Sequence, residues 1–454
     1  MQLDFPFIFA FVATLLGIIL LAWGGGSKAK NSNDFSLAGR SAGSWTVSGA
    51  IIGTLVGGAS TIGTAQLAFL YGLSAWWFTL GAGLACLFLG IFLAIPLRQS
   101  QVETIPQFIS RYYGHRARVV ASLFSGLGMF IQIVAQLLAC GAILAVLFDL
   151  SLLWSASISA LLVILFTLGG GMKAAGKTGL IKMLLIYLTM LACGWLALAR
   201  GGGYHQLTDS LPRFPWFSMF GYGVKEGVSD LLSMLVGVIS TQTYLQAVFS
   251  ASDTKSARGG ALLSAMIIPP LGLLGILVGL YMRQTVPDLE SALALPTFIS
   301  QNFPAAFAGV AFATLLIAAV GTASGLALGV ATTLKADVLG GTFTSKFGGL
   351  VFFRWLTAMV VLSAFVLLLF NLGSAIMDWS FLSMGLRGAT IFFPLLFAVF
   401  SRRTQLARYG ALSIFIAPVS VVAAGLLQVD LVPPLYIGLG VSLALLAIGA
   451  IKKA

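Results

Sequence analysis

A segment rich in glycine and hydroxyl side chains interrupts one of the apolar runs of this chain, and it reads Gly49-Ala-Ile-Ile-Gly53-Thr54-Leu-Val56-Gly57-Gly58-Ala-Ser60-Thr61-Ile-Gly63-Thr64. Four glycines and four hydroxyl side chains fall within residues 53–64. Each glycine costs a helix roughly 1 kcal/mol relative to alanine, so we expect the helix to unwind here. Inside a membrane, unwound backbone is tolerated only where it is buried or lines a cavity.

The composition of the whole chain places this segment in a membrane. Of 454 residues, 59% are hydrophobic and 8% are charged, and the mean hydropathy is +1.02. A soluble domain carries about 25% charged residues, so a soluble fold is excluded. A membrane-spanning helix needs about 20 apolar residues. Thirteen runs of this kind are present, at 5–24, 44–71, 74–97, 119–148, 152–170, 179–199, 226–250, 259–282, 305–334, 350–370, 375–400, 409–427 and 432–450.

The distribution of Lys and Arg predicts how these spans are oriented. When the connections alternate between two sides, nineteen basic residues fall on one side, whereas the other side receives only Arg200, Arg213, Lys225 and Arg283. Basic residues concentrate on the cytoplasmic side. We therefore expect a multi-pass protein of the plasma (inner) membrane with its N-terminus outside and its C-terminus in the cytoplasm. The net charge of +12 then reflects the topology, and the basic residues that produce it can contact anionic lipid. No nucleic-acid partner is expected.

A second interruption lies five spans after the first, in the seventh span, and it reads Ser240-Thr241-Gln242-Thr243-Tyr244-Leu-Gln246. Two interrupted helices at matching places in two five-span halves indicate an inverted-repeat transporter, whose substrate and ion sites lie near the middle of the membrane. The alternative interpretation is that the small and hydroxyl residues only allow the helices to pack closely.

The ninth span carries a stripe of small residues, Gly321-Thr322-Ala-Ser324-Gly325-Leu-Ala-Leu-Gly329. Gly53 and Gly57 have the same spacing as the glycines of this stripe. If the two stripes face each other, carbonyls freed in the second span lie near the Thr322 hydroxyl. Such a group of oxygens suits a hard monovalent cation such as sodium.

Four charged residues fall inside spans, where charge is costly and indicates function. Asp230 is near the outer end of the seventh span, where solvation is a sufficient explanation. Asp378 and Arg387 are nine residues apart, about 13 Å along one helix, which is too far for direct pairing. Arg387 either satisfies carbonyls of a broken helix or holds a carboxylate. Lys182 either extends to the cytoplasmic surface or brings its ammonium to the cation site.

These features resemble the sodium:solute symporter family, which includes the proline, pantothenate, sialic acid and sodium–glucose transporters. The resemblance rests on Phe35-Ser-Leu-Ala-Gly39-Arg40, Gly57-Gly-Ala-Ser-Thr-Ile-Gly63 with Tyr71-Gly72, Glu103-Thr-Ile-Pro-Gln-Phe, and Gly169-Gly-Gly-Met-Lys173-Ala-Ala. It implies an all-α membrane protein with a leucine-transporter-type fold of about thirteen helices. The single membrane domain 1–454 would comprise an extra helix at 5–24, five-helix inverted repeats at 44–200 and 223–400, and two accessory helices at 404–450.

The resemblance also implies a sodium site, and this chain departs from it. The expected ligands are the backbone carbonyls of Gly53, Val56 and Ala318, and two adjacent hydroxyls at the positions of Gly321 and Thr322. Glycine at 321 removes one of these hydroxyls.

The sixth span departs from the family pattern as well. The acidic residue usual there is replaced by Gly179, and Lys182 follows one turn later. A lysine pointing inward would repel sodium by about 1–4 kcal/mol at a few Å. We expect coupling to sodium through an atypical site. The alternatives are coupling to a proton through Lys182, or transport that does not depend on sodium.

By the same resemblance, the solute binds between the second and seventh spans, covered by the third and eleventh. The candidate lining residues are Ser60, Phe78, Thr79, Thr241, Gln242 and Met377. Trp76 and Trp77 lie either at the rim of this pocket or in an interfacial aromatic belt. This set of side chains suits a small polar organic solute. The charge of the solute stays undecided, because no unpaired charge lines the pocket unless Arg387 or Asp378 turns inward.

We therefore expect a secondary active transporter that imports such a solute by alternating access, functions as a monomer and has no organic cofactor. A ligand sensor on the same fold is less favoured, because such proteins usually carry a soluble signalling domain and this chain stops at Lys452-Lys453-Ala454, just past the last span. Intramembrane catalysis is not expected, because the spans lack paired carboxylates and Ser/His or His–Glu clusters. The three cysteines lie in apolar runs and both histidines in polar connections. A primary pump would need a phosphate-binding G-x-x-x-x-G-K-[ST] loop, which is absent from the sequence.

Overall fold

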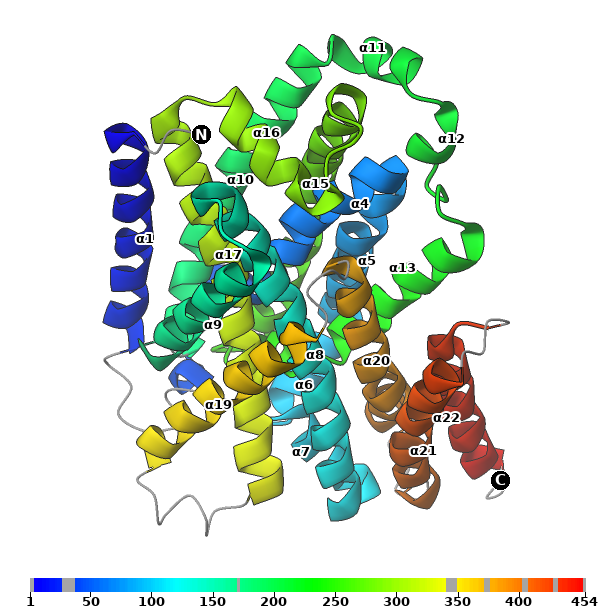
Figure 1. Cartoon of the computed structure of the whole chain (residues 1–454). Helices are drawn as coiled ribbons and strands as arrows, with labels where there is room; N and C mark the ends of the chain where they lie inside the picture. The colour runs from blue at the N-terminus through cyan, green and yellow to red at the C-terminus, as the bar shows by residue number, and fades with distance from the viewer. Residues whose placement is uncertain are drawn as a thin grey trace.

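Helices lie over all thirteen apolar runs in the computed structural model (Figure 1). It describes residues 4–26, 37–169, 172–339, 349–370, 376–401, 407–427 and 432–451. The family phrases at Phe35 and at residues 170–171 therefore lie partly outside the described residues. The helices are α1 (Phe5–Gly26), η1 (Ala38–Arg40), α3 (Ser44–Leu55), η2 (Ala59–Gly63), α4 (Thr64–Tyr71), η3 (Gly72–Ala75), α5 (Trp76–Phe88), η4 (Leu89–Leu93), α6 (Ala94–Gln99), α7 (Ile105–Tyr113), α8 (His115–Phe148), α9 (Leu152–Gly169), α10 (Met172–Arg200), α11 (Gly203–Ser210), α12 (Arg213–Trp216), α13 (Val224–Ile239), α14 (Gln242–Phe249), α15 (Thr254–Thr285), η5 (Ser291–Leu293), α16 (Ala294–Asn302), α17 (Ala305–Thr333), η6 (Leu334–Leu339), α19 (Gly349–Leu369), α20 (Ile376–Phe400), α21 (Ala407–Leu426) and α22 (Pro434–Ile451).

Some of these helices are long and apolar enough to cross a membrane. Among the described residues nine segments meet that criterion by length and composition, or ten if the bent pair α13–α14 is one span. Two shorter apolar helices lie at Phe5–Leu20 and Leu153–Thr167. The count of thirteen spans, the orientation of the termini and the boundaries of the two repeats stay predictions.

The predicted interruption of the second span is present. Helix α3 ends at Leu55, Val56 is extended (φ −85°, ψ 100°), and a π-helical turn, η2, follows. The freed backbone N–H groups are satisfied, because Gly57 N donates to Ser60 Oγ at 2.9 Å and Gly58 N donates to Gln136 Oε1 at 2.8 Å. A Cβ on Gly58 would lie 2.1 Å from the Ala139 Cβ, so α8 packs directly on the break and a larger residue does not fit.

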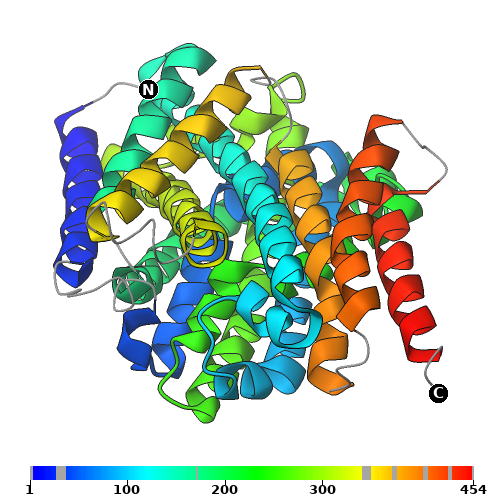
Figure 2. The ribbon, with the colours of Figure 1, turned by 90° about the horizontal axis from the view of Figure 1, so that it is seen from below.

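The seventh span is interrupted as well. Helices α13 and α14 meet at Ser240 and Thr241 with a bend of 41°. The first break lies against α8, α17 and α20, and the second lies against α17 and α20. These three are the most buried of the long apolar helices. Helix α1 flanks one side of the bundle and the pair α21–α22 flanks the other (Figures 1 and 2). The two breaks are therefore enclosed by protein, as unwound backbone in a membrane must be.

Candidate ion and solute site

The ammonium of Lys182 lies at the break of the second span. Lys182 is on α10 and is only 4% exposed. Its Nζ donates to the carbonyl oxygens of Gly53 and Ala318 at 2.6 and 2.7 Å, and to Thr322 Oγ1 at 3.0 Å. All three N–H bonds of the ammonium thus have oxygen acceptors. Lys182 turns inward rather than toward the surface, and it joins α10 to both α3 and α17.

These acceptors are three of the five predicted sodium ligands. The Val56 carbonyl is adjacent, since it accepts a hydrogen bond from Thr322 Oγ1 at 3.3 Å. Gly321 faces the lysine, because a Cβ built there would lie 3.6 Å from Nζ. The structure therefore brings the predicted ligands together around a positive charge that belongs to the chain itself.

The replacement of the family's acidic residue by Gly179 has a steric reason. A Cβ at Gly179 would lie 2.0 Å from the carbonyl oxygen of Gly49 and 3.4 Å from the Cα of Gly53. The backbones of α10 and α3 are therefore in contact, and an aspartate cannot fit between them. The same contact sets Lys182, one turn later, against Gly53.

We expect Gly179→Ala to lower the thermal stability of the purified protein. The new methyl group meets backbone atoms, which cannot rotate away, and overpacking of this kind costs about 1–3 kcal/mol. The matched control is Gly126→Ala on α8, where a Cβ meets nothing within 4 Å. The measurement is the melting temperature in detergent. Equal melting temperatures for the two variants would contradict the close α10–α3 contact.

Four of the predicted solute-binding residues lie at the two breaks or on the helices that cover them. Phe78 on α5 packs edge-on against Phe381 on α20, with ring centroids 5.7 Å apart. Met377 on α20 faces η2, where a Cβ on Gly63 would lie 3.2 Å from its sulfur. Ser60 belongs to η2 itself. Thr241, at the other break, accepts a hydrogen bond from Arg387.

The other two predicted lining residues, Thr79 and Gln242, make other contacts in this structure, and their role in solute binding stays a prediction. Thr79 packs on α15, where a Cβ on Gly272 would lie 2.0 Å from its hydroxyl. Gln242 contacts the segment before α7: its Oε1 accepts from Ile105 N at 2.9 Å and its Nε2 donates to Glu103 O at 3.1 Å. The reason is helical geometry, since adjacent residues such as Phe78 and Thr79 do not face the same way.

The tryptophans beside Phe78 are anchored within the protein. The Trp76 indole N–H donates to Pro269 O at 2.9 Å, and the Trp77 indole N–H donates to Met219 O at 2.6 Å. Both side chains are partly exposed. Their polar atoms thus hold α5 to α15 and to the connection before α13.

Arg387, whose direction the sequence left open, turns inward. Its Nη1 donates to Thr241 Oγ1 at 2.8 Å and its Nη2 donates to Ser383 Oγ at 2.8 Å. Asp378 is exposed and does not pair with it. Asp230 accepts a hydrogen bond from the Tyr222 hydroxyl at 2.6 Å.

A buried polar cluster that the sequence analysis missed closes the basic end of the bundle. Asp337, in η6, accepts hydrogen bonds from Arg118 Nε at 2.7 Å, Ser122 Oγ at 3.0 Å and Thr104 Oγ1 at 3.0 Å. Thr104 also caps α7. We name Asp337, Arg118, Ser122 and Thr104 the polar lock. Gln242 binds the residues on either side of Thr104, so this end of α14 is tied to the lock.

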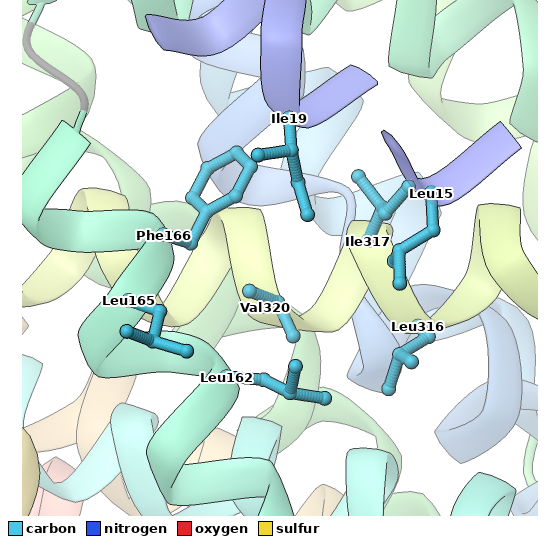
Figure 3. Close-up of a pocket in the computed structure, with 8 residues that line it drawn as sticks. All are labelled: Leu15, Ile19, Leu162, Leu165, Phe166, Leu316, Ile317 and Val320. Carbon is cyan, nitrogen blue, oxygen red and sulfur yellow. The ribbon is translucent and has the colours of Figure 1, made fainter. Parts of the chain in front are cut away.

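An apolar cavity of about 180 Å³ lies between α1, α9 and α17 (Figure 3). It is lined by Leu15, Ile19, Leu162, Leu165, Phe166, Leu316, Ile317 and Val320. None of these side chains offers a hydrogen-bond donor or acceptor, so the cavity does not suit a polar solute.

The family assignment follows from sequence comparison. A family model described as "Sodium:solute symporter family" matches residues 35–417. The chain belongs to the sodium:solute symporter family. This confirms the resemblance inferred from the sequence motifs. The family's description is that of transporters, which agrees with the expectation of a transporter rather than an enzyme.

Relatives of this chain are transporters by name. It is 25% identical to the "High affinity choline transporter 1" of Homo sapiens over 60% of this chain and 48% of the relative. It is 21% identical to the "Sodium/glucose cotransporter" of Vibrio parahaemolyticus over 72% of this chain and 67% of the relative. The chain thus spans about half the length of the choline transporters it matches.

Solved structures with the same architecture confirm the predicted fold class. A Na⁺-coupled sialic acid symporter in a substrate-bound outward-open state matches with a TM-score of 0.82 at 16% identity, over 99% of this chain and 98% of that one. MHP1, a nucleobase-cation-symport-1 family transporter, matches with a TM-score of 0.64 at 14% identity, over 93% of this chain and 95% of that one. The chain therefore has an all-α membrane-protein fold of the leucine-transporter type.

Proposed function

We propose that this protein is a secondary active transporter that imports a small polar organic solute across the plasma membrane by alternating access. The proposal includes an outside N-terminus, a cytoplasmic C-terminus, inverted repeats at 44–200 and 223–400, and a monomer as the working unit. Family membership and the two broken helices support it. The solute would bind at the breaks, near Ser60, Phe78, Thr241 and Met377.

The observation that carries the coupling proposal is the position of the Lys182 ammonium. Its hydrogen bonds join the broken α3 to α17, and this linkage is what a cation bound to the same oxygens would provide. A charged ammonium has three N–H donors, whereas a neutral amine has two and no charge. We infer that gain and loss of a proton at Lys182 strengthens and weakens the α3–α17 linkage, and that a proton is the coupling ion.

Sodium is the second candidate, and the same oxygen atoms favour it. The carbonyls of Gly53, Val56 and Ala318 and the hydroxyl of Thr322 converge on one place, and hard oxygens suit sodium. Sodium would bind there only after Lys182 has moved out, because the two positive charges compete for the same ligands. The family's name and the sialic acid symporter support this candidate.

Uptake into proteoliposomes under imposed ion gradients distinguishes the two ions. We expect an inwardly directed proton gradient to drive solute accumulation without sodium. A sodium gradient at equal pH on both sides should give no more accumulation than a potassium gradient. Accumulation driven by sodium alone would contradict coupling through Lys182 and support the second candidate.

A further inference from the structure

Arg387 carries a buried positive charge for which the described residues supply no carboxylate. The side chain lies on α20 and is 0% exposed. Among the described residues, no Asp or Glu pairs with it. An unpaired charge in a low-dielectric interior is strongly unfavourable, and an ionisable residue kept inside a membrane protein indicates function.

All described acceptors of the Arg387 guanidinium are neutral. In addition to Thr241 Oγ1 and Ser383 Oγ, its Nε donates to the Ser383 carbonyl at 3.1 Å and its Nη2 contacts the Met384 sulfur at 3.1 Å. It also hydrogen-bonds the Tyr244 hydroxyl. None of these acceptors is a carbonyl of the broken α13, so capping that helix does not explain the arginine. A thioether sulfur is moreover a weak acceptor.

The break between α13 and α14 adds a second feature that suits an anion. Thr241 precedes α14 and its side chain does not cap that helix, whose N-terminal N–H groups carry partial positive charge. The Thr241 hydroxyl donates to the Gly237 carbonyl at 2.6 Å, so it is oriented to accept from Arg387. The buried Ser240 hydroxyl beside it has no partner among the described residues. The guanidinium thus contacts Thr241, which directly precedes the N-terminus of α14 and follows Ser240 in the chain.

We propose that Arg387 binds the carboxylate of the transported solute, so that the carrier selects small organic acids. This inference rests on the proposed transport function and names the substrate class of the same site. A guanidinium presents parallel N–H donors that match the two oxygens of a carboxylate. The solute's negative charge would supply the partner that the described residues do not.

The neighbours of Arg387 allow this exchange of partners. The stem of the arginine crosses α8 at Gly128, where a Cβ would lie 2.4 Å from its Cγ, so its path is fixed by the glycine. The Met384 side chain that contacts Nη2 is flexible and unbranched, and it can move aside for a carboxylate oxygen. The head group can therefore change partners while the stem stays in place.

Ligand-induced thermal stabilisation of the purified protein tests the proposal. The probes are acetate, pyruvate, L-lactate and L-proline at about 10 mM, with lactamide, prolinamide, choline and glucose as uncharged or cationic counterparts, because a ligand stabilises the state that binds it. We expect at least one carboxylate to raise the melting temperature while its amide does not. Arg387→Met should weaken that carboxylate's binding roughly 30-fold or more, as loss of one partner of a buried charge pair does.

The same variant separates a binding role from a structural one. Replacing a buried charge by an apolar side chain of similar size is often neutral or stabilising, so Arg387→Met without ligand should melt no lower than the parent. Arg354→Met, on the peripheral helix α19, is the matched control and should bind the carboxylate as the parent does. If Arg387 is only structural, Arg387→Met will melt lower and will bind carboxylate and amide with an unchanged ratio, which overturns the proposal.

Two further results would overturn the carboxylate site. One is the absence of stabilisation by every carboxylate probe. The other is that choline or glucose binds and that Arg387→Met leaves this affinity unchanged. Uptake of choline or glucose by proteoliposomes would in that case still support the transport function. Conversely, carboxylate binding that depends on Arg387 without any uptake would support the site and contradict the transport function.

Discussion

Replacing Lys182 with glutamine should lower solute accumulation by about 100-fold or more and abolish its response to a pH gradient. Each hydrogen bond from a charged donor contributes about 1.5–3 kcal/mol, and the ammonium makes three of them to α3 and α17. A glutamine amide has two N–H donors, no charge and no proton to exchange near neutral pH. The measurement is the initial rate and final level of uptake in proteoliposomes that contain equal amounts of folded protein.

The control for this variant is Lys255→Gln. Lys255 is exposed at the start of α15, so the same change in charge and shape occurs away from the broken helices. Its uptake should match that of the parent. A Lys182→Gln protein that still accumulates solute in response to a pH gradient would show that the proton is carried elsewhere.

A double variant, Lys182→Gln with Gly321→Ser, should acquire a response to sodium. Removal of the ammonium frees the carbonyls of Gly53 and Ala318, and the serine adds a hydroxyl beside Thr322. Space for the serine is available, since a Cβ at residue 321 makes only ordinary contacts, the shortest at 3.6 Å. Sodium, but not potassium, should then raise the melting temperature of the double variant. A folded double variant whose melting temperature does not change with sodium would contradict the view that these oxygens form a cation site.

Asp337→Asn should shift the protein toward a state that is open to the cytoplasm. Asp337 is buried, whereas the Arg118 side chain is 23% exposed and can be partly hydrated once the pair is broken. We therefore expect less than the 3–5 kcal/mol of a fully buried pair, about 1–3 kcal/mol. Such a change shifts the conformational equilibrium by roughly 10- to 100-fold.

The accessibility of a cysteine at Ser240 reports this shift. Ser240 is buried at the break of the seventh span, and the three native cysteines are also buried, so the background of labelling is low. The rate of maleimide labelling from the cytoplasmic side should rise about tenfold or more in the Asp337→Asn background. Asp253→Asn is the control, because it removes an exposed carboxylate that caps α15. If Asp337→Asn lowers the melting temperature but leaves labelling unchanged, the polar lock is structural and does not gate transport.

The sequence was sufficient to predict features that depend on local chemistry. The glycine cluster predicted where α3 ends, because loss of side chains weakens a helix. The sequence also offered the inward orientation of Lys182 as one of two possibilities. The contact between Gly179 and Gly49 decides between them, and it joins residues 130 positions apart.

Features that depend on the direction of a side chain were harder to predict. Thr241 and Gln242 are adjacent and similar in polarity. The Thr241 side chain nevertheless contacts Arg387, whereas the Gln242 side chain contacts Glu103. The polar lock gave no signal in the sequence, because Asp337 and Arg118 are 219 residues apart and neither differs from its neighbours in type. Thr104 was noticed only as part of a family phrase, without a role.

The covalent attachment of the Lys182 ammonium has a kinetic consequence. A free ion leaves its site at a rate set by affinity, and its occupancy follows the concentration in solution. A tethered cation has a high and fixed effective concentration at its ligands. Occupancy of this site would therefore be independent of the sodium outside the cell, and the number of charges it contributes could never exceed one per cycle. A carrier built in this way would work equally well in fresh water and in brine, as long as a difference in pH is maintained across its membrane.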